Sequence, residues 1–211
     1  MTDTELEKRT AAEAAALLVE DGMIVGLGTG STIAHLLPAL ARRELRLRCI
    51  ATSPATERLA RELGLPVEPF DDLERLDIAI DGADQIDRAG WVVKGGGGAH
   101  AREKVVAAAA ERFVVIASSD KLVDSVAAPI PLELLRFGLA ATLVRVAPAE
   151  LRDAPPSPDN GVIADYLGEV DDPAAVAARL AGIPGVVDHG LFGPELVSEV
   201  LIGRGSEVER R

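Results

Sequence analysis

The stretch Met23-Ile24-Val25-Gly26-Leu27-Gly28-Thr29-Gly30-Ser31-Thr32 decides the predicted fold. Its first half is apolar and predicts a buried strand, whereas its second half combines glycines with hydroxyl side chains and opens a helix over residues 32–43. A strand that turns tightly into a helix brings backbone N–H groups toward a phosphate. The stretch therefore predicts an α/β protein with an anion-binding loop after its first strand.

Two better-known motifs can be compared with this loop, and neither fits. A dinucleotide-binding fingerprint would have glycine or alanine where Ser31 stands, and an acidic residue after the second strand, where the chain reads Ala51-Thr52-Ser53. A P-loop would have a lysine before its serine or threonine. The remaining interpretation is a loop for a small phosphoester, with Thr29, Ser31 and Thr32 as ligands. A tight turn capped by a hydroxyl side chain stays open as the alternative.

The composition limits the class of protein. The chain has 211 residues, of which 48% are hydrophobic and only 3% aromatic, which suits the aliphatic core of a helix-covered parallel sheet. The net charge of −12 argues against nucleic acid and anionic membrane as partners. A single cysteine, Cys49, and an N-terminus without a basic, apolar leader fit a cytoplasmic protein. No apolar stretch approaches the ~20 residues of a membrane helix.

Hydrophobic patterning predicts a regular alternation of strands and helices in the first part of the chain and a different succession of elements after it. The predicted helices of the first part are 4–20, 32–43, 56–63 and 99–112, and the strands are 23–28, 47–51, 76–80, 91–93 and 113–117. This pattern is typical of a doubly wound, mostly parallel sheet. After residue 129, helices at 136–146 and 173–181 and strands at 161–167, 186–192 and 197–202 predict a small α+β, ferredoxin-like appendage. We expect an α/β domain of residues 1–128 and 199–211, and a small domain of residues 129–198.

Two further motifs place charged side chains beside flexible backbone. The strand at 76–80 leads into Asp81-Gly82-Ala83-Asp84, and two carboxylates at this ligand-binding edge of a sheet can divide acid and base work. Lys94 precedes four glycines, whose freedom suits backbone that approaches a ligand closely. Glu103 follows beside a positive helix N-terminus, as a candidate base. A solvated Asp-Gly turn and a divalent-metal site are the competing interpretations of the aspartates, although no histidine stands at ligand spacing.

Other polar residues carry weaker signals. Lys121 follows the strand at 113–117 and therefore lies at the same sheet edge, which makes it a candidate anion contact. Cys49 and His35 are interpreted as core residues. His100, at a helix start, is interpreted as a ligand contact or a solvated side chain, and His189 receives no role.

Taken together, three motifs resemble one family. Gly28-Thr29-Gly30-Ser31-Thr32, Asp81-Gly82-Ala83-Asp84, and Lys94-Gly95-Gly96-Gly97 with Arg102-Glu103-Lys104 are similar to the A type of ribose-5-phosphate isomerase, a cofactor-free family of the pentose phosphate pathway. The resemblance implies that Glu103 is the proton-transferring base, that Asp81 and Asp84 assist ring opening and hydroxyl handling, and that Lys94 steadies negative charge. It also implies substrate contacts at Thr29, Gly30, Ser31, Thr32, Gly82, Ala83, Gly95, Gly96, Gly97, Lys121 and Lys8.

The reaction that this resemblance implies interconverts ribose 5-phosphate and ribulose 5-phosphate through an enediolate, without metal or cofactor. The family also implies a homodimer. The segment 147–160 departs from the family, which leaves any lid or subunit contact there open.

Two alternative functions remain. A sugar-phosphate sensor normally follows a DNA-binding module, for which the residues before Met23 are expected to leave no room. A coenzyme A transferase would use a glutamate as nucleophile, which does not explain Asp81, Asp84 and Lys94.

Overall fold

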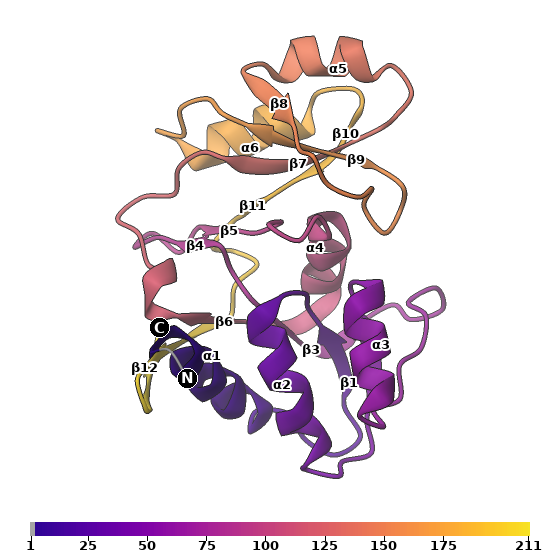
Figure 1. Cartoon of the computed structure of the whole chain (residues 1–211), viewed down its shortest axis with the longest axis vertical. Coiled ribbons are helices and arrows are strands. Elements are labelled where there is room, and N and C mark those ends of the chain that lie inside the picture. The colour runs from indigo at the N-terminus through magenta and orange to yellow at the C-terminus, as the bar shows by residue number, and fades with distance from the viewer. Residues whose placement is uncertain (1–2) are drawn as a thin grey trace. The chain divides into compact units, whose positions relative to one another are not determined.

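This computed structural model describes residues 3–211. They form two units (Figure 1). The first unit consists of the chain up to Ala83, Glu103–Lys121 and Glu195–Arg211, and the second consists of Asp84–Arg102 and Leu122–Pro194. The sequence predicts functional domains with a boundary near residue 129, which differs from the limits of these two units. That division into functional domains stays a prediction.

The first unit is built on a six-stranded sheet in the order β13-β12-β6-β3-β1-β2. Its strands are β1 (Ile24–Leu27), β2 (Arg48–Ala51), β3 (Leu76–Asp81), β6 (Ala110–Ser118), β12 (Glu199–Arg204) and β13 (Glu207–Arg210). Of these, β1, β3, β6 and β12 are labelled in Figure 1. All neighbours are parallel except β12 and β13, which form an antiparallel hairpin. This sheet confirms the predicted mostly parallel α/β class.

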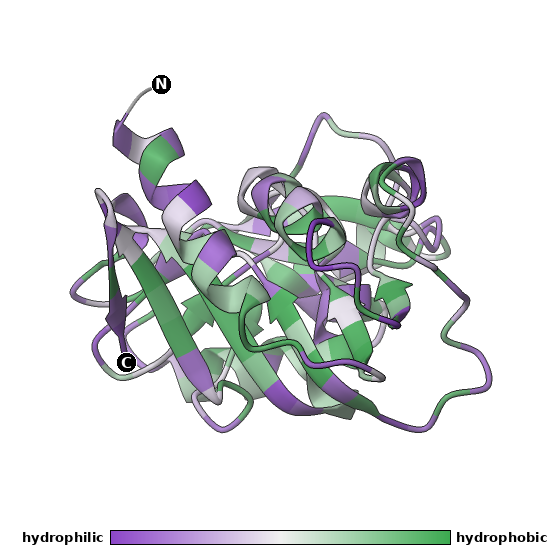
Figure 2. Ribbon diagram, turned by 90° about the horizontal axis from the view of Figure 1, so that it is seen from below, coloured by the Kyte–Doolittle hydropathy of each residue, from purple (hydrophilic) through white to green (hydrophobic). Residues whose placement is uncertain are grey.

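Helices pack against this sheet through small and aliphatic side chains. They are α1 (Asp3–Ala16), α2 (Ser31–Ala41), α3 (Pro54–Glu62) and α4 (His100–Ala109), which begins in the second unit and continues into the first. The buried face of α1 is made of alanines, namely Ala11, Ala12, Ala15 and Ala16. A Cβ added at Gly203 of β12 would lie 2.0 Å from the Glu7 carbonyl oxygen, so this glycine permits a close approach of α1 to the sheet. Figure 2 shows the resulting mostly hydrophobic strands and the mixed surfaces of the helices.

Helices α1 and α4 end clearly earlier than the sequence predicts. The helix predicted over 4–20 ends at Ala16, because the N–H groups of Leu17 and Leu18 turn back to carbonyls three residues earlier. The helix predicted over 99–112 ends at Ala109, since Ala110 already pairs with Leu76 of β3. In this second case, sheet pairing overrides the helical preference of an alanine-rich segment.

The second unit contains a four-stranded antiparallel sheet in the order β10-β7-β9-β8. Its elements follow one another as β7 (Ile130–Leu134), α5 (Leu139–Val146), β8 (Ala149–Leu151), β9 (Val162–Tyr166), α6 (Pro173–Ala181) and β10 (Val186–His189). This is the βαββαβ succession of a ferredoxin-like unit. The sequence prediction missed β8, because its three residues are half-buried or exposed and are too few to show a hydrophobic pattern.

A second antiparallel sheet in this unit joins three very short strands. Its order is β11-β5-β4, with β4 (Gln85–Ile86), β5 (Val92–Val93) and β11 (Leu191–Phe192). The single strand predicted over 186–192 is therefore wrong. It divides at Gly190 into β10 and β11, which belong to different sheets. Within residues 3–211, no helix combines the length and the apolar character that crossing a bilayer requires.

Candidate active site

Asp81 ends β3 and is held rigidly by backbone of the first unit. Its side chain is 3% exposed, and its Oδ1 accepts hydrogen bonds from the N–H groups of Thr29, at 3.0 Å, and Gly82, at 2.7 Å. A Cβ at Gly28 would stand 1.9 Å from the same oxygen. The missing side chain of Gly28 thus allows the loop after β1 to contact the carboxylate. Asp81 lies, as the sequence predicted, at the carboxyl end of its strand.

The loop after β1 uses some of its hydroxyl groups internally. The Thr52 hydroxyl donates to the Leu27 carbonyl at 3.2 Å, so the 2.8 Å contact between the Thr29 and Thr52 hydroxyls leaves Thr29 as the donor. Thr29 therefore supports the loop. Helix α2 begins with Gly30 as its N-cap, at φ 113°, and no side chain caps it. The alternative of a hydroxyl-capped turn is therefore wrong, and the exposed Ser31 and half-buried Thr32 stand at an uncapped helix N-terminus.

Glu103 belongs to the first turn of α4, where a carboxylate is favoured by the helix dipole. Its side chain is only 4% exposed. His100, at the start of the same helix, is fully buried. A Cβ at Gly95 would lie 2.7 Å from the His100 Nδ1 atom, which shows that the imidazole packs directly against the glycine run. The interpretation of His100 as a solvated side chain is therefore wrong.

Lys94 and the glycine run lie in the second unit. The Lys94 side chain is 3% exposed, and its Nζ is 5.6 Å from the centre of the Phe192 ring, within the range of a cation–π interaction. Its N–H donates to the Gly190 carbonyl at 2.9 Å. Gly96 donates its N–H to the Asp84 Oδ2 at 2.8 Å. The structure thus brings Asp84 and the glycine run together, as it brings together Asp81 and the Thr29 loop in the first unit.

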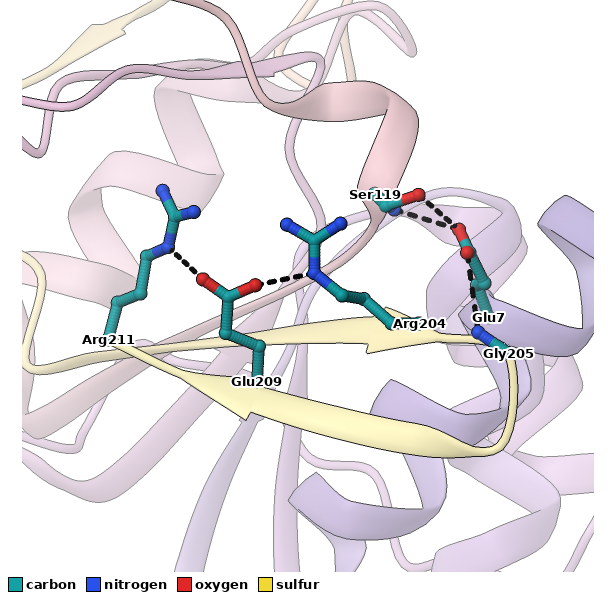
Figure 3. A network of polar contacts seen from close by, with 6 residues as sticks. All are labelled: Glu7, Ser119, Arg204, Gly205, Glu209 and Arg211. Carbon is teal, nitrogen blue, oxygen red and sulfur yellow. Dashed lines mark hydrogen bonds and ion pairs between the residues drawn. The ribbon is translucent and has the colours of Figure 1, made fainter.

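Lys121 lies in a short turn that is hydrogen-bonded to α1. It ends the 3₁₀ turn η1 (Ser119–Lys121), which follows β6, and its Nζ lies 3.4 Å from Asp120. Glu7 of α1 accepts hydrogen bonds from the Ser119 N–H at 2.9 Å and the Ser119 hydroxyl at 2.8 Å, as Figure 3 shows. It also accepts the N–H of Gly205 at 3.3 Å. Burial raises the pKa of Glu7, but these hydrogen bonds outweigh burial and lower it.

Lys8, the next residue of α1, contacts a carboxylate of its own helix. Its Nζ lies 2.7 Å from Glu5, and the same carboxylate contacts His35 at 2.9 Å.

Cys49 is buried, and this burial raises the pKa of its thiol to about 12, so the thiolate needed for nucleophilic chemistry is scarce at neutral pH. Among residues 3–211, no three His, Cys, Asp or Glu side chains gather as they would around a metal ion.

Sequence reasoning missed two residues, Glu7 and Arg152, that form hydrogen bonds to segments carrying candidate site residues. Arg152 donates to the carbonyl groups of Gly95 and Gly96 in the second unit. Both act across long stretches of sequence, so no local spacing could have found them. Within the first unit, the parallel order places Thr29, Asp81 and Lys121 after or at the ends of β1, β3 and β6, which is one edge of the sheet.

Open α/β sheets bind their ligands at the carboxyl ends of their strands. Polar side chains gathered at this edge are therefore typical of an α/β protein that binds a small ligand there. The family model of ribose 5-phosphate isomerase A (phosphoriboisomerase A) matches residues 48–207. The chain is 46% identical to ribose-5-phosphate isomerase A of Caulobacter vibrioides, over 97% of this chain and 96% of that protein. The chain therefore belongs to the ribose 5-phosphate isomerase A family.

Solved structures of this family share the fold. Ribose 5-phosphate isomerase A of Methanocaldococcus jannaschii superimposes with a TM-score of 0.91 at 33% identity, covering 97% of both chains. A D-ribose-5-phosphate isomerase in complex with phospho-erythronic acid gives a TM-score of 0.91 at 32% identity, covering 100% of this chain and 99% of that one. These matches confirm the resemblance, the fold class and the isomerase character of the chain.

Proposed function

We propose that this chain interconverts ribose 5-phosphate and ribulose 5-phosphate. The observation that carries the proposal is the 46% identity over 97% of the chain to a relative named for this activity. The phospho-erythronic acid bound to a neighbouring structure supports a phosphorylated sugar as the substrate class. These relatives do not favour the alternatives of a sensor domain or a coenzyme A transferase.

The proposed chemistry is a proton transfer between adjacent carbons. After the sugar ring opens with help from Asp81 and Asp84, the Glu103 carboxylate removes the proton from C2, and the electron pair of that bond moves to give an enediolate. The hydroxyl proton of O2 then moves to O1 and the carbon-bound proton returns to C1, which completes the ketose. Lys94 and the amides of Gly95, Gly96 and Gly97 stabilise the negative oxygen. The loop from Thr29 to Thr32 binds the substrate through the Ser31 and Thr32 hydroxyl groups and the amides at the start of α2, while Thr29 and Gly30 shape the loop. Gly82, Ala83, Lys8 and Lys121 complete the proposed binding site. No metal or cofactor takes part in this scheme.

The decisive experiment uses the variant Glu103→Gln and substrate deuterated at C2. We expect the variant to fold and to bind ribose 5-phosphate but to lose at least about 100-fold in kcat, because general-base catalysis contributes roughly that much. Glu111→Gln is the matched control, since Glu111 is an exposed residue paired with Arg75 at 3.0 Å. The wild-type protein, assayed after extensive chelation, should turn over and lose deuterium to water.

Two results would contradict the scheme. Complete retention of deuterium in the ribulose 5-phosphate, together with an active Glu103→Gln variant, would replace the enediolate with a direct hydride shift. A chelated wild-type protein that regains activity with one divalent ion would show that the reaction needs a metal.

We further propose that the chain works as a homodimer in the cytoplasm. Exposed apolar side chains of the second unit support an interface: Phe137 is 92% exposed, and Leu135 and Val144 are exposed as well. Leu135 and Phe137 stand close together in the chain, and apolar side chains that are exposed together are typical of protein contacts. Sedimentation velocity should give the mass of a dimer, and a monomer at micromolar concentration would contradict the proposal.

A further inference from the structure

Arg152 directly follows β8 and binds the glycine run through one of its nitrogens. Its Nη1 donates to the Gly95 carbonyl at 2.8 Å and to the Gly96 carbonyl at 3.1 Å. The other edge of the guanidinium is occupied by Asp165 of β9, which accepts from Nε at 2.9 Å and from Nη2. The backbone N–H of Arg152 also donates to the Ile163 carbonyl at 3.0 Å. The backbone and the guanidinium group of Arg152 are therefore both hydrogen-bonded to β9.

The peptide unit between Gly95 and Gly96 is held from two opposite sides. Its carbonyl accepts from Arg152, and its N–H donates to Asp84 at 2.8 Å. Because the C=O and N–H of a trans peptide point in opposite directions, rotation of this plane would break both contacts. The two contacts together specify the orientation of the peptide.

The same reasoning fixes the direction of the next amide. The carbonyl of Gly96 also accepts from the Arg152 Nη1, so the N–H of Gly97 points away from the arginine. Gly97 is exposed, and in the part of the chain that the structure describes its N–H has no hydrogen-bond acceptor. An oriented, exposed N–H is suited to a negatively charged oxygen.

A glycine run needs such a restraint. Glycine loses more conformational freedom on ordering than any other residue, and Gly95, with φ 109°, adopts a conformation that other residues rarely reach. A lysine at position 152 could not replace the restraint, because a single ammonium group cannot bind Asp165 side-on and both carbonyl groups at once.

We propose that Arg152 is a positioning residue that orients the amides of the glycine run for catalysis. It acts through the peptide units of Gly95 and Gly96, so that the Gly97 N–H is presented to the substrate oxygen that becomes negative in the enediolate. This inference rests on the proposed isomerase function, and it gives a role to the divergent segment 147–160.

The test compares Arg152→Lys with the wild-type protein in kinetics and in amide hydrogen exchange. We expect kcat to fall by about 10-fold or more, since losing a whole oxyanion donor costs about 100-fold. KM should change by less than about threefold, because the interaction forms mainly in the transition state. Exchange in residues 94–99, followed by mass spectrometry, should become faster. Arg88→Lys is the matched control, since Arg88 pairs with Asp124 at 2.6 Å on the surface of the same unit.

A second variant separates positioning from folding. In Arg152→Ala, guanidinium ion at sub-denaturing concentration should restore part of kcat, whereas ammonium ion should not. A folded Arg152→Lys protein with wild-type kcat, unchanged exchange at 94–99, or an Arg152→Ala protein that guanidinium does not rescue would overturn the proposal. If the wild-type protein fails to isomerise ribose 5-phosphate, the proposed function fails, and the exchange measurement still decides whether Arg152 orders the loop.

Discussion

Two carboxylates show how their surroundings set stability at the scale of single residues. Hydrogen bonds lower the pKa of Glu7, so its contribution to stability is present above its unfolded pKa and is lost as the pH falls through the folded value. Burial raises the pKa of Glu133, despite a hydrogen bond from Ser157. For Glu133 the sign is reversed: stability is highest below the unfolded pKa and falls as the pH rises through the folded pKa.

Glu7 provides a prediction at this scale. In Glu7→Gln one oxygen becomes an NH₂ group that faces N–H donors of Ser119 or Gly205, so we expect a loss of about 1–2 kcal/mol in the free energy of unfolding. Urea denaturation at pH 7 measures this loss, and the difference from wild type should shrink as the pH falls below the ordinary glutamate pKa and through the lowered pKa of Glu7, where the carboxylate becomes protonated. The control Glu13→Gln removes only an exposed contact with Arg42 at 3.5 Å, worth about 0–1 kcal/mol. Equal effects of the two substitutions would contradict the role of Glu7.

At the scale of elements, Gly190 separates two strands of the second unit. A Cβ there would lie 2.1 Å from the Lys94 carbonyl oxygen and 2.9 Å from Pro131. We expect Gly190→Ala to reduce the free energy of unfolding by about 1–3 kcal/mol, as overpacking does, and to lower turnover because the Lys94 backbone must move. Gly182→Ala is the control, since its nearest atom is 3.3 Å away. Thermal unfolding and turnover measure both variants, and a fully stable, active Gly190→Ala protein would contradict the packing argument.

The elements also show what the sequence could predict. Helix α6 was predicted with its observed bounds, because Asp172 caps it, Pro173 begins it and Gly182 ends it, all local signals. The short strands β8 and β11 were missed or merged, since pairing with distant residues defines them. The same contrast holds at the candidate site. Asp81 could be placed from its own strand, whereas Arg152 contacts the carbonyl of Gly95, 57 positions earlier in the chain.

At the scale of the whole molecule, the chain returns to the first unit at its end. Strand β12 pairs with β6, and its Val200, Leu201 and Ile202 are buried. Burying each such side chain contributes roughly 1.5–3 kcal/mol. Their sum is comparable with the entire stability of a typical domain, about 5–15 kcal/mol. The fold of the first unit therefore depends on residues that follow the whole second unit in the chain.

Truncation tests this dependence. A chain that stops after Pro194 loses β12 and β13 and turns the apolar β6 into an exposed edge, so we expect aggregation and no cooperative thermal transition for the first unit. A chain that stops after Ser206 keeps β12 and Gly205, the partner of Glu7, and loses only the half-exposed β13. It should remain folded with a lower Tm. Size-exclusion chromatography and circular dichroism compare the two truncated chains with the full chain. If the chain ending at Pro194 is monodisperse and unfolds cooperatively at the temperature of the longer one, then β6 does not need β12, and the order of the sheet does not set the stability of the unit.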